Sequence, residues 1–293
     1  MDVSVIVVNY NAGELAAACI DSVFAHTSGL DFEMILVDNA STDGSRSRFE
    51  ADARIRYVYS PENLGFGRAN NLGLTYASGR NILFLNSDTL LRDNAIKILS
   101  DYLDAHPGVG AVGGNLVDGQ GLPGQSFMRY YPSLWEEFNL FWDGLPDRLR
   151  YGRNRFYNHG GKPLAAAVIS GADLMVPRKV LDACGAFDPD FFLYYEDTEL
   201  CFRIHRAGFR LMALPDARIV HLGGGSTGGD RAKIASYARK MAARRCFLSK
   251  TCTPFKARLI MGMRRLTVET RLLVHRFHPE RRAKWKAYQS ALG

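Results

Sequence analysis

Short polar segments follow successive apolar runs in the first part of the sequence. Asn9 and Asn11 follow the first run, Asp38 follows the second, Asn63 the third, and Asn86-Ser87-Asp88 the fourth. Amide and carboxylate oxygens of this kind hydrogen-bond a nucleotide base or ribose, and carboxylates also bind hard cations such as Mg²⁺. These segments are therefore the first candidates for a binding site.

Both aspartates also have a structural role available. Asp38 opens the segment Asp38-Asn-Ala-Ser-Thr-Asp-Gly44, in which Asp, Ser and Thr side chains are suited to cap a helix. Ser41 or Asp43 could cap that helix while Asp38 binds a base or ribose. An isolated loop aspartate such as Asp88 is usually a turn former, yet a nucleoside diphosphate needs a divalent ion, and Mg²⁺ takes one or two carboxylates plus phosphate oxygens.

A second group of carboxylates lies in the segment Tyr194-Tyr-Glu-Asp-Thr-Glu199, which opens a predicted helix. Acidic residues in the first turn of a helix interact favourably with its dipole. Glu199 is also four residues before Arg203, the spacing of a helical ion pair. The pattern alone thus assigns Asp197 a role as an N-terminal helix acid.

Alternating strands and helices position the first group of polar residues. Val3 to Val8 is typical of a strand buried on both faces. Helices are expected at about Ala12–Phe24, Thr42–Ala51 and Gly67–Ala77, and strands at Met34–Val37, Ile55–Tyr59 and Ile82–Leu85. This order predicts an α/β fold with right-handed crossovers, a doubly wound, mostly parallel sheet and helices on both of its faces. Ligands bind outside the carboxyl ends of such strands, so the polar segments should line one crevice.

The rest of the chain is less regular. Residues 115–162 show no clear periodicity, and Ala165 to Val176 forms an apolar run that contains Gly171 and Asp173. Arg210 to Val220 is predicted to be a strand that leads to His221. Residues 231–293 are predicted to be helical, with breaks at Pro254 and Pro279. We therefore expect one domain over residues 1–230 and a basic helical extension over 231–293.

Composition limits the class of protein. With 293 residues, 47% of them hydrophobic, the chain is able to bury a substantial core. Its 5 cysteines are scattered without a CxxC pair, which argues against a disulfide framework or a zinc knuckle and favours the cytoplasm. The N-terminus does not match a signal peptide, and no apolar run approaches the ~20 residues that span a bilayer.

Charge is distributed unevenly. The whole chain has 37 Lys+Arg and 30 Asp+Glu, but residues 231–293 hold 17 Lys+Arg against 2 Asp+Glu. Such a segment suggests, as one alternative, a protein that binds nucleic acid through its phosphates. A second alternative is a serine hydrolase, because Gly224-Gly-Ser-Thr-Gly228 matches the GxSxG motif. We rank both of these alternatives low and expect no nucleic-acid partner.

Several of these motifs together resemble family 2 glycosyltransferases, and most closely their rhamnosyltransferase-like branch. The resemblance covers residues 1 to about 230. It is carried by Val3-Ser-Val-Ile-Val-Val-Asn-Tyr-Asn11, Val37-Asp-Asn-Ala-Ser-Thr-Asp-Gly-Ser45, Asn63-Leu-Gly-Phe-Gly-Arg-Ala-Asn-Asn71, Leu85-Asn-Ser-Asp88 and Tyr195-Glu-Asp-Thr-Glu-Leu200. Each motif is weak alone, but their order and spacing make the set specific.

The resemblance implies a GT-A fold and an inverting sugar transfer from a nucleoside diphosphate sugar. It implies that Asp38 contacts the base, that Asp88 binds Mg²⁺ or Mn²⁺ within a DxD-like element, and that Asp197 is the catalytic base. His221 is similar to a histidine that completes the metal site in some members. The chain departs from the acidic pattern at Asn86. Further implied binding residues are Asn9, Tyr10, Asn11, Asn63, Gly67, Asn70, Asn86, Ser87, Gly171, Ala172, Asp173 and Glu196.

These implied roles agree with the chemistry of the reaction. A general base takes the proton of the acceptor hydroxyl, and a divalent ion stabilises the leaving diphosphate. One carboxylate suffices as base because the donor is already activated, whereas a glycosidase needs two. A histidine ligand favours Mn²⁺.

The donor expected from the branch is dTDP-rhamnose, with UDP-hexoses next. The acceptor is expected to be a cell-envelope glycan or a lipid-linked sugar. Basic helices that carry Leu and Trp residues lie on anionic membranes. We therefore expect the basic extension to hold the protein peripherally on the cytoplasmic face of the membrane.

Overall fold

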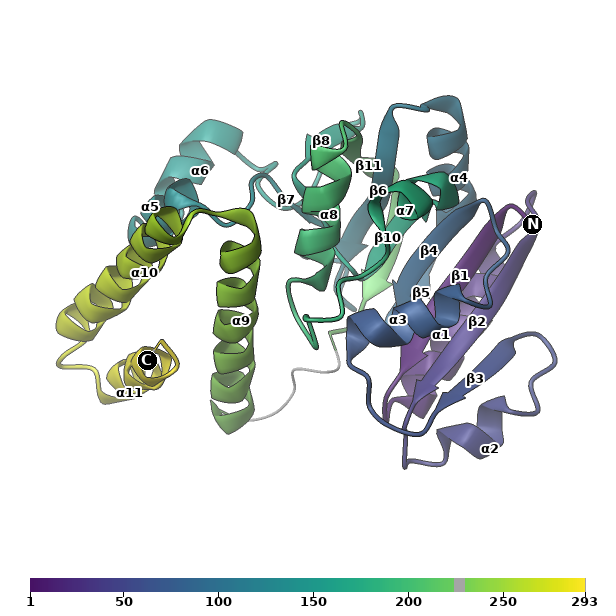
Figure 1. Ribbon diagram of the computed structural model, residues 1–293, viewed down its shortest axis with the longest axis horizontal. Coiled ribbons are helices and arrows are strands. Elements are labelled where there is room, and N and C mark those ends of the chain that lie inside the picture. Colours follow the sequence, from purple (N-terminus) through teal and green to yellow (C-terminus); the bar gives the residue numbers. More distant parts are fainter. Residues whose placement is uncertain (224–229, 293) are drawn as a thin grey trace. The chain divides into compact units, whose positions relative to one another are not determined.

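The computed structural model describes residues 1–223 and 230–292 (Figure 1). These residues divide into two compact units. The sheet unit consists of Met1–Arg129, Arg153–Phe192 and Glu196–Gly223. The helical unit consists of Tyr130–Gly152, Leu193–Tyr195 and the part of the chain that follows Gly223. Residues 130–152, which showed no periodicity in the sequence, thus belong with the C-terminal helices.

Four parallel strands form the first half of the central sheet, in the order β3-β2-β1-β4. They are β1 (Val3–Asn9), β2 (Phe32–Asn39), β3 (Arg56–Ser60) and β4 (Asn81–Asn86), joined by α1 (Gly13–His26), α2 (Ser45–Phe49) and α3 (Phe66–Leu74). The chain builds outward from β1 to β3 and then returns to place β4 on the other side of β1. The boundary between β1 and β4 is therefore the switch point of a doubly wound sheet, where ligands bind in such folds.

The sheet continues beyond β4 with both parallel and antiparallel strands. The next strands in order are β10 (Asp173–Pro177), β6 (Val109–Val117), β11 (Arg210–His221) and β5 (Thr89–Leu91), and β8 (Leu164–Ala166) also pairs with β11. The apolar run predicted over residues 165–176 is thus divided among β8, β9 (Val168–Ile169) and β10. β9 pairs with β7 (Phe127–Met128) in a separate small sheet.

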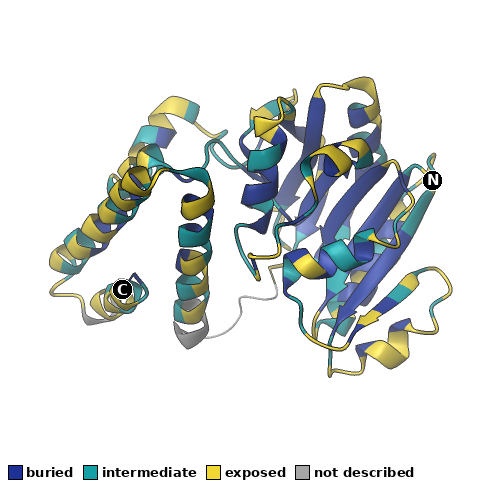
Figure 2. Ribbon diagram, viewed as in Figure 1, coloured by how far each residue is buried: buried dark blue, intermediate teal, exposed yellow. Residues whose placement is uncertain are grey.

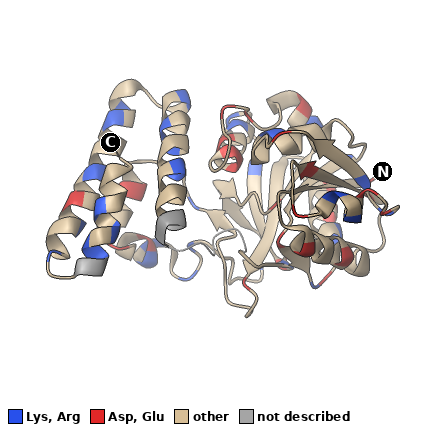
Figure 3. Cartoon of the chain, turned by 90° about the horizontal axis from the view of Figure 1, so that it is seen from below, with Lys and Arg blue, Asp and Glu red and all other residues tan. Residues whose placement is uncertain are grey.

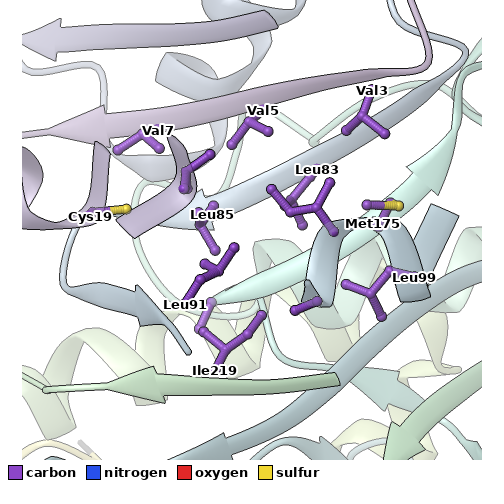
Figure 4. Close-up of a cluster of buried hydrophobic side chains, with 14 of the residues drawn as sticks. Val3, Val5, Val7, Cys19, Leu83, Leu85, Leu91, Leu99, Met175 and Ile219 are labelled. Carbon is purple, nitrogen blue, oxygen red and sulfur yellow. The ribbon is translucent and has the colours of Figure 1, made fainter. Parts of the chain in front are cut away.

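Successive residues of β1 are buried, as its β-branched composition predicts, so both faces of this strand are covered. Figure 2 shows that most of the central strands are coloured as buried. On one face Val3, Val5 and Val7 pack with residues of α1 and α4 (Ala95–Ala105) in a large apolar cluster (Figure 4). On the other face α3 approaches β1 closely, because a Cβ at Gly73 would lie 2.6 Å from Ile6 Cγ2. α7 (Arg178–Cys184) packs on β10, and α8 (Glu196–Arg206) packs on β9. The predicted fold class is confirmed.

The helix predicted over residues 42–51 is shorter than expected, because the first residues of this range form a loop that is held by hydrogen bonds. Asp43 accepts hydrogen bonds from the backbone N–H groups of Gly13 (3.0 Å) and Ser45 (3.1 Å). Gly44 then adopts a positive φ of 84°, so α2 begins only at Ser45.

The helical unit contains α5 (Leu134–Phe141), α6 (Leu145–Tyr151), α9 (Asp230–Thr251), α10 (Pro254–Val274) and α11 (Pro279–Ser290). The helix breaks predicted at Pro254 and Pro279 are confirmed. Many Lys and Arg residues lie along these helices (Figure 3). None of the helices in the described part of the chain combines the length and the apolar character needed to cross a bilayer.

A buried cluster of charges joins α5 to α9 and α10 within this unit. The side chains of Glu137 and Arg244 are 0% and 1% exposed. Arg244 donates to Glu136 Oε2 (2.8 Å) and to Glu137. Arg264 donates from Nε to Glu137 Oε2 (2.7 Å) and from Nη2 to Glu137 Oε1 (3.0 Å). Because charges this deeply buried need partners, each of the three helices depends on the others.

Candidate active site

The carboxyl ends of β1, β2 and β4 bring the first group of predicted residues to one edge of the sheet. The register pairs Asn9 with Asp38 and Val8 with Asn86. Ser41, which the prediction of site residues omitted, joins the loops after β1 and β2. Its hydroxyl accepts hydrogen bonds from Asn9 Nδ2 (3.1 Å) and from the backbone N–H of Asn11 (3.0 Å). The two loops therefore hold one another in place.

Asp38 is completely buried and is bonded by groups of its own chain. Its Oδ1 accepts from the backbone N–H of Ser41 (2.9 Å), and its Oδ2 accepts from the Tyr57 hydroxyl (2.7 Å). Burial and the Asp38 carboxylate raise the pKa of Tyr57, so this hydroxyl remains a donor. By contrast, Tyr10 is 51% exposed and Asn11 is exposed. Tyr10 and Asn11 are thus accessible at this end of the sheet, whereas Asp38 is not.

Asn63 shapes the loop that precedes α3. Its Oδ1 accepts from Asn39 Nδ2 (3.0 Å) and from the backbone N–H of Gly65 (2.9 Å). Asn39, which follows Asp38 in the same polar segment, also accepts from the N–H of Leu64 (2.8 Å). Gly65 has a φ of 78°, and a Cβ there would lie 2.2 Å from the Phe192 carbonyl oxygen. This position therefore requires glycine.

Asp88 and His221 lie together, although they are far apart in the sequence. Asp88 Oδ1 is 3.2 Å from His221 Nε2, and Asn86 Nδ2 is 3.3 Å from the same ring nitrogen. β5 and β11 are paired, which brings His221 beside the turn after β4. Burial lowers the pKa of His221, but the hydrogen bond and charge of Asp88 outweigh it, so this pKa is raised. Ser87 lies in the same turn.

Asp173 at the start of β10 is a buried carboxylate close to this pair. Its Oδ2 accepts from the backbone N–H of Gly114 (2.5 Å), while its Oδ1 has no hydrogen-bond partner. Burial raises the pKa of Asp173 to about 7, and the hydrogen bond from Gly114 and the nearby His221 oppose that shift. A proton or a cation would satisfy the unbonded oxygen.

The short segment Ser170–Asp173 connects this group to the acidic end of α8. The Ala172 carbonyl accepts from the backbone N–H of Asn86 (3.0 Å). The backbone N–H of Gly171 donates to Asp197 Oδ2 (3.0 Å). A Cβ at Gly171 would lie 3.3 Å from Asp197 Cβ, so the small residue permits this contact. Consecutive residues of one segment thus contact Asn86, which lies beside the Asp88–His221 pair, and Asp197.

Asp197 and Glu196 are adjacent carboxylates in different surroundings. Asp197 accepts hydrogen bonds from the N–H of Gly171 and from the N–H (2.6 Å) and hydroxyl (3.1 Å) of Thr198. Burial raises the pKa of Asp197, and these hydrogen bonds oppose the shift. Glu196 Oε2 is buried without a hydrogen-bond partner, and burial together with the Asp197 charge raises the pKa of Glu196 to about 8. The hydrogen bonds to Asp197 thus favour its ionised form, and Glu196 Oε2 has no such bond.

Two of the remaining predicted residues lie on α3. A Cβ at Gly67 would be 3.5 Å from Glu196 Cβ, which places this glycine beside the acidic pair. Asn70 donates to the Phe66 carbonyl of its own helix (3.0 Å), and its Oδ1 is buried without a partner. Asn71, which was quoted only as part of a motif, exchanges hydrogen bonds with the backbone N–H and carbonyl of Phe187. The GxSxG segment lies outside the residues that the structure describes.

The donor atoms near Asp88 fit a metal ion that is shared with a ligand. Within residues 1–223 and 230–292, no set of three or more His, Cys, Asp or Glu side chains is close enough to hold a metal by itself. Asp88 Oδ1 and His221 Nε2 supply one oxygen and one nitrogen, 3.2 Å apart. Mg²⁺ and similar ions commonly take one or two protein carboxylates and complete their coordination with phosphate oxygens and water. The residues present thus suit an ion that bridges to a diphosphate.

Comparison with known proteins identifies the class to which this fold and site belong. The family model described as glycosyl transferase family 2 matches residues 4–161, which is more than half of the chain. The chain therefore belongs to glycosyl transferase family 2. The matched range includes the ends of β1, β2 and β4.

Particular relatives are rhamnosyltransferases. The chain is 25% identical over 191 residues to the dTDP-rhamnosyl transferase RfbF of Shigella flexneri, covering 64% of this chain and 59% of that protein. It is 29% identical over 216 residues to the N-acetylglucosaminyl-diphospho-decaprenol L-rhamnosyltransferase of Mycobacterium tuberculosis, covering 68% of this chain and 69% of that one. The chain thus spans about three-fifths of the length of the Shigella protein.

Solved structures support the fold. The mannosyltransferase PcManGT of Pyrobaculum calidifontis, in complex with GDP-Man and Mn²⁺, aligns with a TM-score of 0.62 at 20% identity, covering 99% of this chain and 84% of that chain. GalNAc-T7 with UDP, GalNAc and Mn²⁺ aligns with a TM-score of 0.58 at 16% identity, covering 76% of this chain and 44% of that chain. Both likenesses establish the GT-A type of sheet unit.

Proposed function

We propose that the chain is an inverting, metal-dependent glycosyltransferase that moves a sugar from a nucleoside diphosphate donor to an acceptor hydroxyl. The observation that carries the proposal is the segment Ser170–Asp173. Its residues contact Asn86, beside the Asp88–His221 pair, and Asp197, each at 3.0 Å. A diphosphate held at the first group and a general base at the second are what such a transfer requires.

The donor is proposed to be dTDP-rhamnose, with a UDP-hexose as the second choice. The names of the Shigella and Mycobacterium relatives support rhamnose. Since Asp38 is fully buried, we propose that Tyr10 and Asn11 supply the outer contacts to the nucleotide. Asp38 orients them through Ser41, which bonds both Asp38 and Asn11.

Asp197 is proposed to take the proton of the acceptor hydroxyl. Its three hydrogen bonds favour the ionised form. The buried Glu196 keeps its proton over most of the neutral range, because a second negative charge beside Asp197 would be unfavourable. A neutral Glu196 thus leaves Asp197 ionised and able to accept a proton.

Asp88 and His221 are proposed to hold Mg²⁺ or Mn²⁺, with Asp173 as a nearby negative charge. When bound, the ion would neutralise charge on the leaving diphosphate. The imidazole of His221 favours Mn²⁺. The Mn²⁺ in both solved structures agrees with this choice.

The acceptor is proposed to be a cell-envelope glycan or a lipid-linked sugar, presented at the cytoplasmic face of the membrane. The name of the Mycobacterium relative specifies a diphospho-decaprenol acceptor. The cations of residues 231–293 would hold the protein on anionic lipid, where each nearby cation contributes ~1 kcal/mol.

The substitution Asp197→Asn tests the catalytic part of the proposal. It should lower kcat by roughly 10²–10⁴-fold, the usual contribution of a general base. Calorimetry should find donor affinity unchanged. The matched control is Asp182→Asn, which changes an exposed aspartate of α7 in the same unit. Normal turnover by Asp197→Asn would exclude Asp197 as the base and leave Glu196 as the next candidate.

A ligand panel tests the donor. Thermal unfolding should be followed with dTDP-rhamnose, UDP-hexoses and the free nucleotides, each with and without Mn²⁺, because a bound ligand stabilises the native state. Stabilisation by dTDP-rhamnose only when Mn²⁺ is present would support both donor and ion. Stabilisation by none of the nucleotide sugars would contradict the proposed function.

A further inference from the structure

The helical unit carries an open apolar groove of about 510 Å³ on α5 and α6. Its lining includes Trp135, Phe138, Trp142, Leu145, Leu149 and Arg150. These residues belong to the segment 130–152, outside the predicted site and outside the basic extension. None of the residues proposed for the sugar transfer lines the groove.

The large apolar side chains of this groove are exposed. Leu149 is 80% exposed, Trp142 is 53% exposed and Phe138 is 43% exposed. An exposed, contiguous group of this kind marks a surface for a protein, a membrane or a ligand. The sequence places Leu149 between two arginines, Arg148 and Arg150, which are also exposed.

The charges around the groove favour a partner with negative charge. Asp147 accepts hydrogen bonds from Trp135 Nε1 (3.0 Å) and Asn139 Nδ2 (2.8 Å), and it is buried. Glu136 and Glu137 are bound by the arginines of the buried cluster. Asp143 is paired with Arg271 (2.5 Å). The acids of the segment are thus engaged within the unit, while the guanidinium of Arg150 lies over the Trp135 ring, 5.3 Å from its centroid.

α10, which packs against α5, repeats the same combination of residues. Four of its exposed apolar residues, Phe255, Leu259, Leu266 and Leu273, are spaced by four or seven positions, so they share one stripe of the helix. Arg258 and Arg265 are exposed beside Leu259 and Leu266. Two elements of one unit therefore combine exposed apolar side chains with cations.

We infer that the exposed apolar side chains lining the α5–α6 groove insert into the headgroup region of an anionic bilayer and anchor the protein there. This inference rests on the proposed membrane contact, but it assigns the apolar part of that contact to a different segment. Trp residues concentrate at the boundary between headgroups and acyl chains. Helices with cations beside Trp and Leu lie in that boundary without spanning the membrane. A neutral protein partner would provide no negative charge for the exposed arginines beside the groove, Arg148 and Arg150.

The test uses the full chain and vesicles of phosphatidylcholine with or without an equal part of phosphatidylglycerol. The double variant Trp142→Ser, Leu149→Ser should bind the anionic vesicles about tenfold or more weakly than wild type, because two side chains no longer leave water. The matched control is Leu122→Ser, which removes a leucine that is 57% exposed in the sheet unit and should bind as wild type does.

Further measurements separate the possible occupants of the groove. Lipids brominated in the acyl chain should quench tryptophan fluorescence in wild type and much less in the double variant. Equal vesicle binding by the double variant and wild type would overturn the inference and leave the basic extension as the contact. Equal binding to vesicles with and without phosphatidylglycerol, or no binding by wild type, would overturn it as well.

Two controls keep these outcomes separate from folding and from catalysis. Sedimentation should find the same oligomeric state for wild type and the double variant, since a dimer that the variant dissociates would identify a second copy as the occupant and overturn the inference. Far-ultraviolet circular dichroism should be unchanged. Transfer to a water-soluble acceptor should also be unchanged, so failure of the anchor and failure of the proposed transferase are distinguishable.

Discussion

Removing the Arg264 guanidinium is expected to destabilise the helical unit strongly. Arg264 makes two hydrogen bonds to Glu137, of 2.7 and 3.0 Å, and the Glu137 side chain is 0% exposed. Hydrogen bonds to charged groups contribute about 1.5–3 kcal/mol each, and breaking one partner of a buried ion pair costs about 3–5 kcal/mol. Because Arg244 continues to bind Glu137, Arg264→Met should cost about 3 kcal/mol, the lower end of that range.

Tryptophan fluorescence measures this effect in the helical unit alone. The chain has 3 tryptophans, Trp135, Trp142 and Trp285, and all of them belong to this unit. A loss of about 3 kcal/mol should move the midpoint of urea unfolding down by about 1–3 M, given slopes of 1–3 kcal/mol per molar urea. The control Arg265→Met removes the same group from the adjacent, exposed position, and it should change stability by less than about 0.5 kcal/mol.

Two results would refute this reasoning. An unfolding midpoint for Arg264→Met equal to that of Arg265→Met would mean that the buried cluster adds no stability. The combination of Arg264→Met with Glu137→Gln should recover part of the loss, because the buried side chain at position 137 then carries no charge that Arg244 alone must neutralise. A combined loss equal to the sum of the two single losses would contradict that explanation.

Further predictions concern the sheet unit. Gly65→Ala should lower the melting temperature more than Gly44→Ala. Both glycines have positive φ, but only at Gly65 would the new Cβ collide with backbone, 2.2 Å from a carbonyl oxygen. Equal shifts in melting temperature would contradict the steric argument. The pKa of Glu196 is raised to about 8, whereas in the unfolded chain it is about 4.3. The stability due to its protonated form is therefore fully present below pH ~4.3 and is lost as pH rises toward ~8, by about 1.4 kcal/mol per pH unit. Glu196→Gln should therefore gain stability relative to wild type across that range in circular-dichroism melts, and a constant difference would refute this. His221→Ala should weaken Mn²⁺-dependent nucleotide binding by roughly tenfold or more in calorimetry and Mg²⁺-dependent binding less, and an unchanged Mn²⁺ affinity would remove His221 from the metal site.

The sheet could be predicted from the sequence because its signals are local. The β-branched run at Val3–Val8 and the repeated alternation of strands and helices specify parallel strands. The polar residues at the ends of those strands then follow from topology, and the register of Asn9 with Asp38 bears this out. The residue types alone did not indicate that Asp38 would be buried, since its partner Tyr57 lies on β3 and depends on the pairing of β2 with β3.

Other features depend on contacts between distant segments. The strand order β10-β6-β11-β5 brings His221 to Asp88 across 133 positions of the sequence. The pair was suggested by the family resemblance and by the position of each residue after an apolar strand. The helix α5 had a local signal, because Ser133 and Glu136 form the start of a capping box in which the Ser133 hydroxyl accepts from the Glu136 N–H (3.4 Å). No periodicity over residues 115–162 indicated that this helix packs with α10, since the buried Glu137 interrupts its apolar face.

The buried charge cluster also has a consequence for the history of the chain. Its acids come from residues 130–152 and its arginines come from α9 and α10, so neither part is suited to exist without the other. A homologue that lost residues 130–152 would keep two arginines among apolar neighbours, and selection would replace them. We expect residues 130–152 and the C-terminal helices to be present or absent together in homologues, with neutral residues at the positions of Arg244 and Arg264 wherever a segment equivalent to 130–152 is missing.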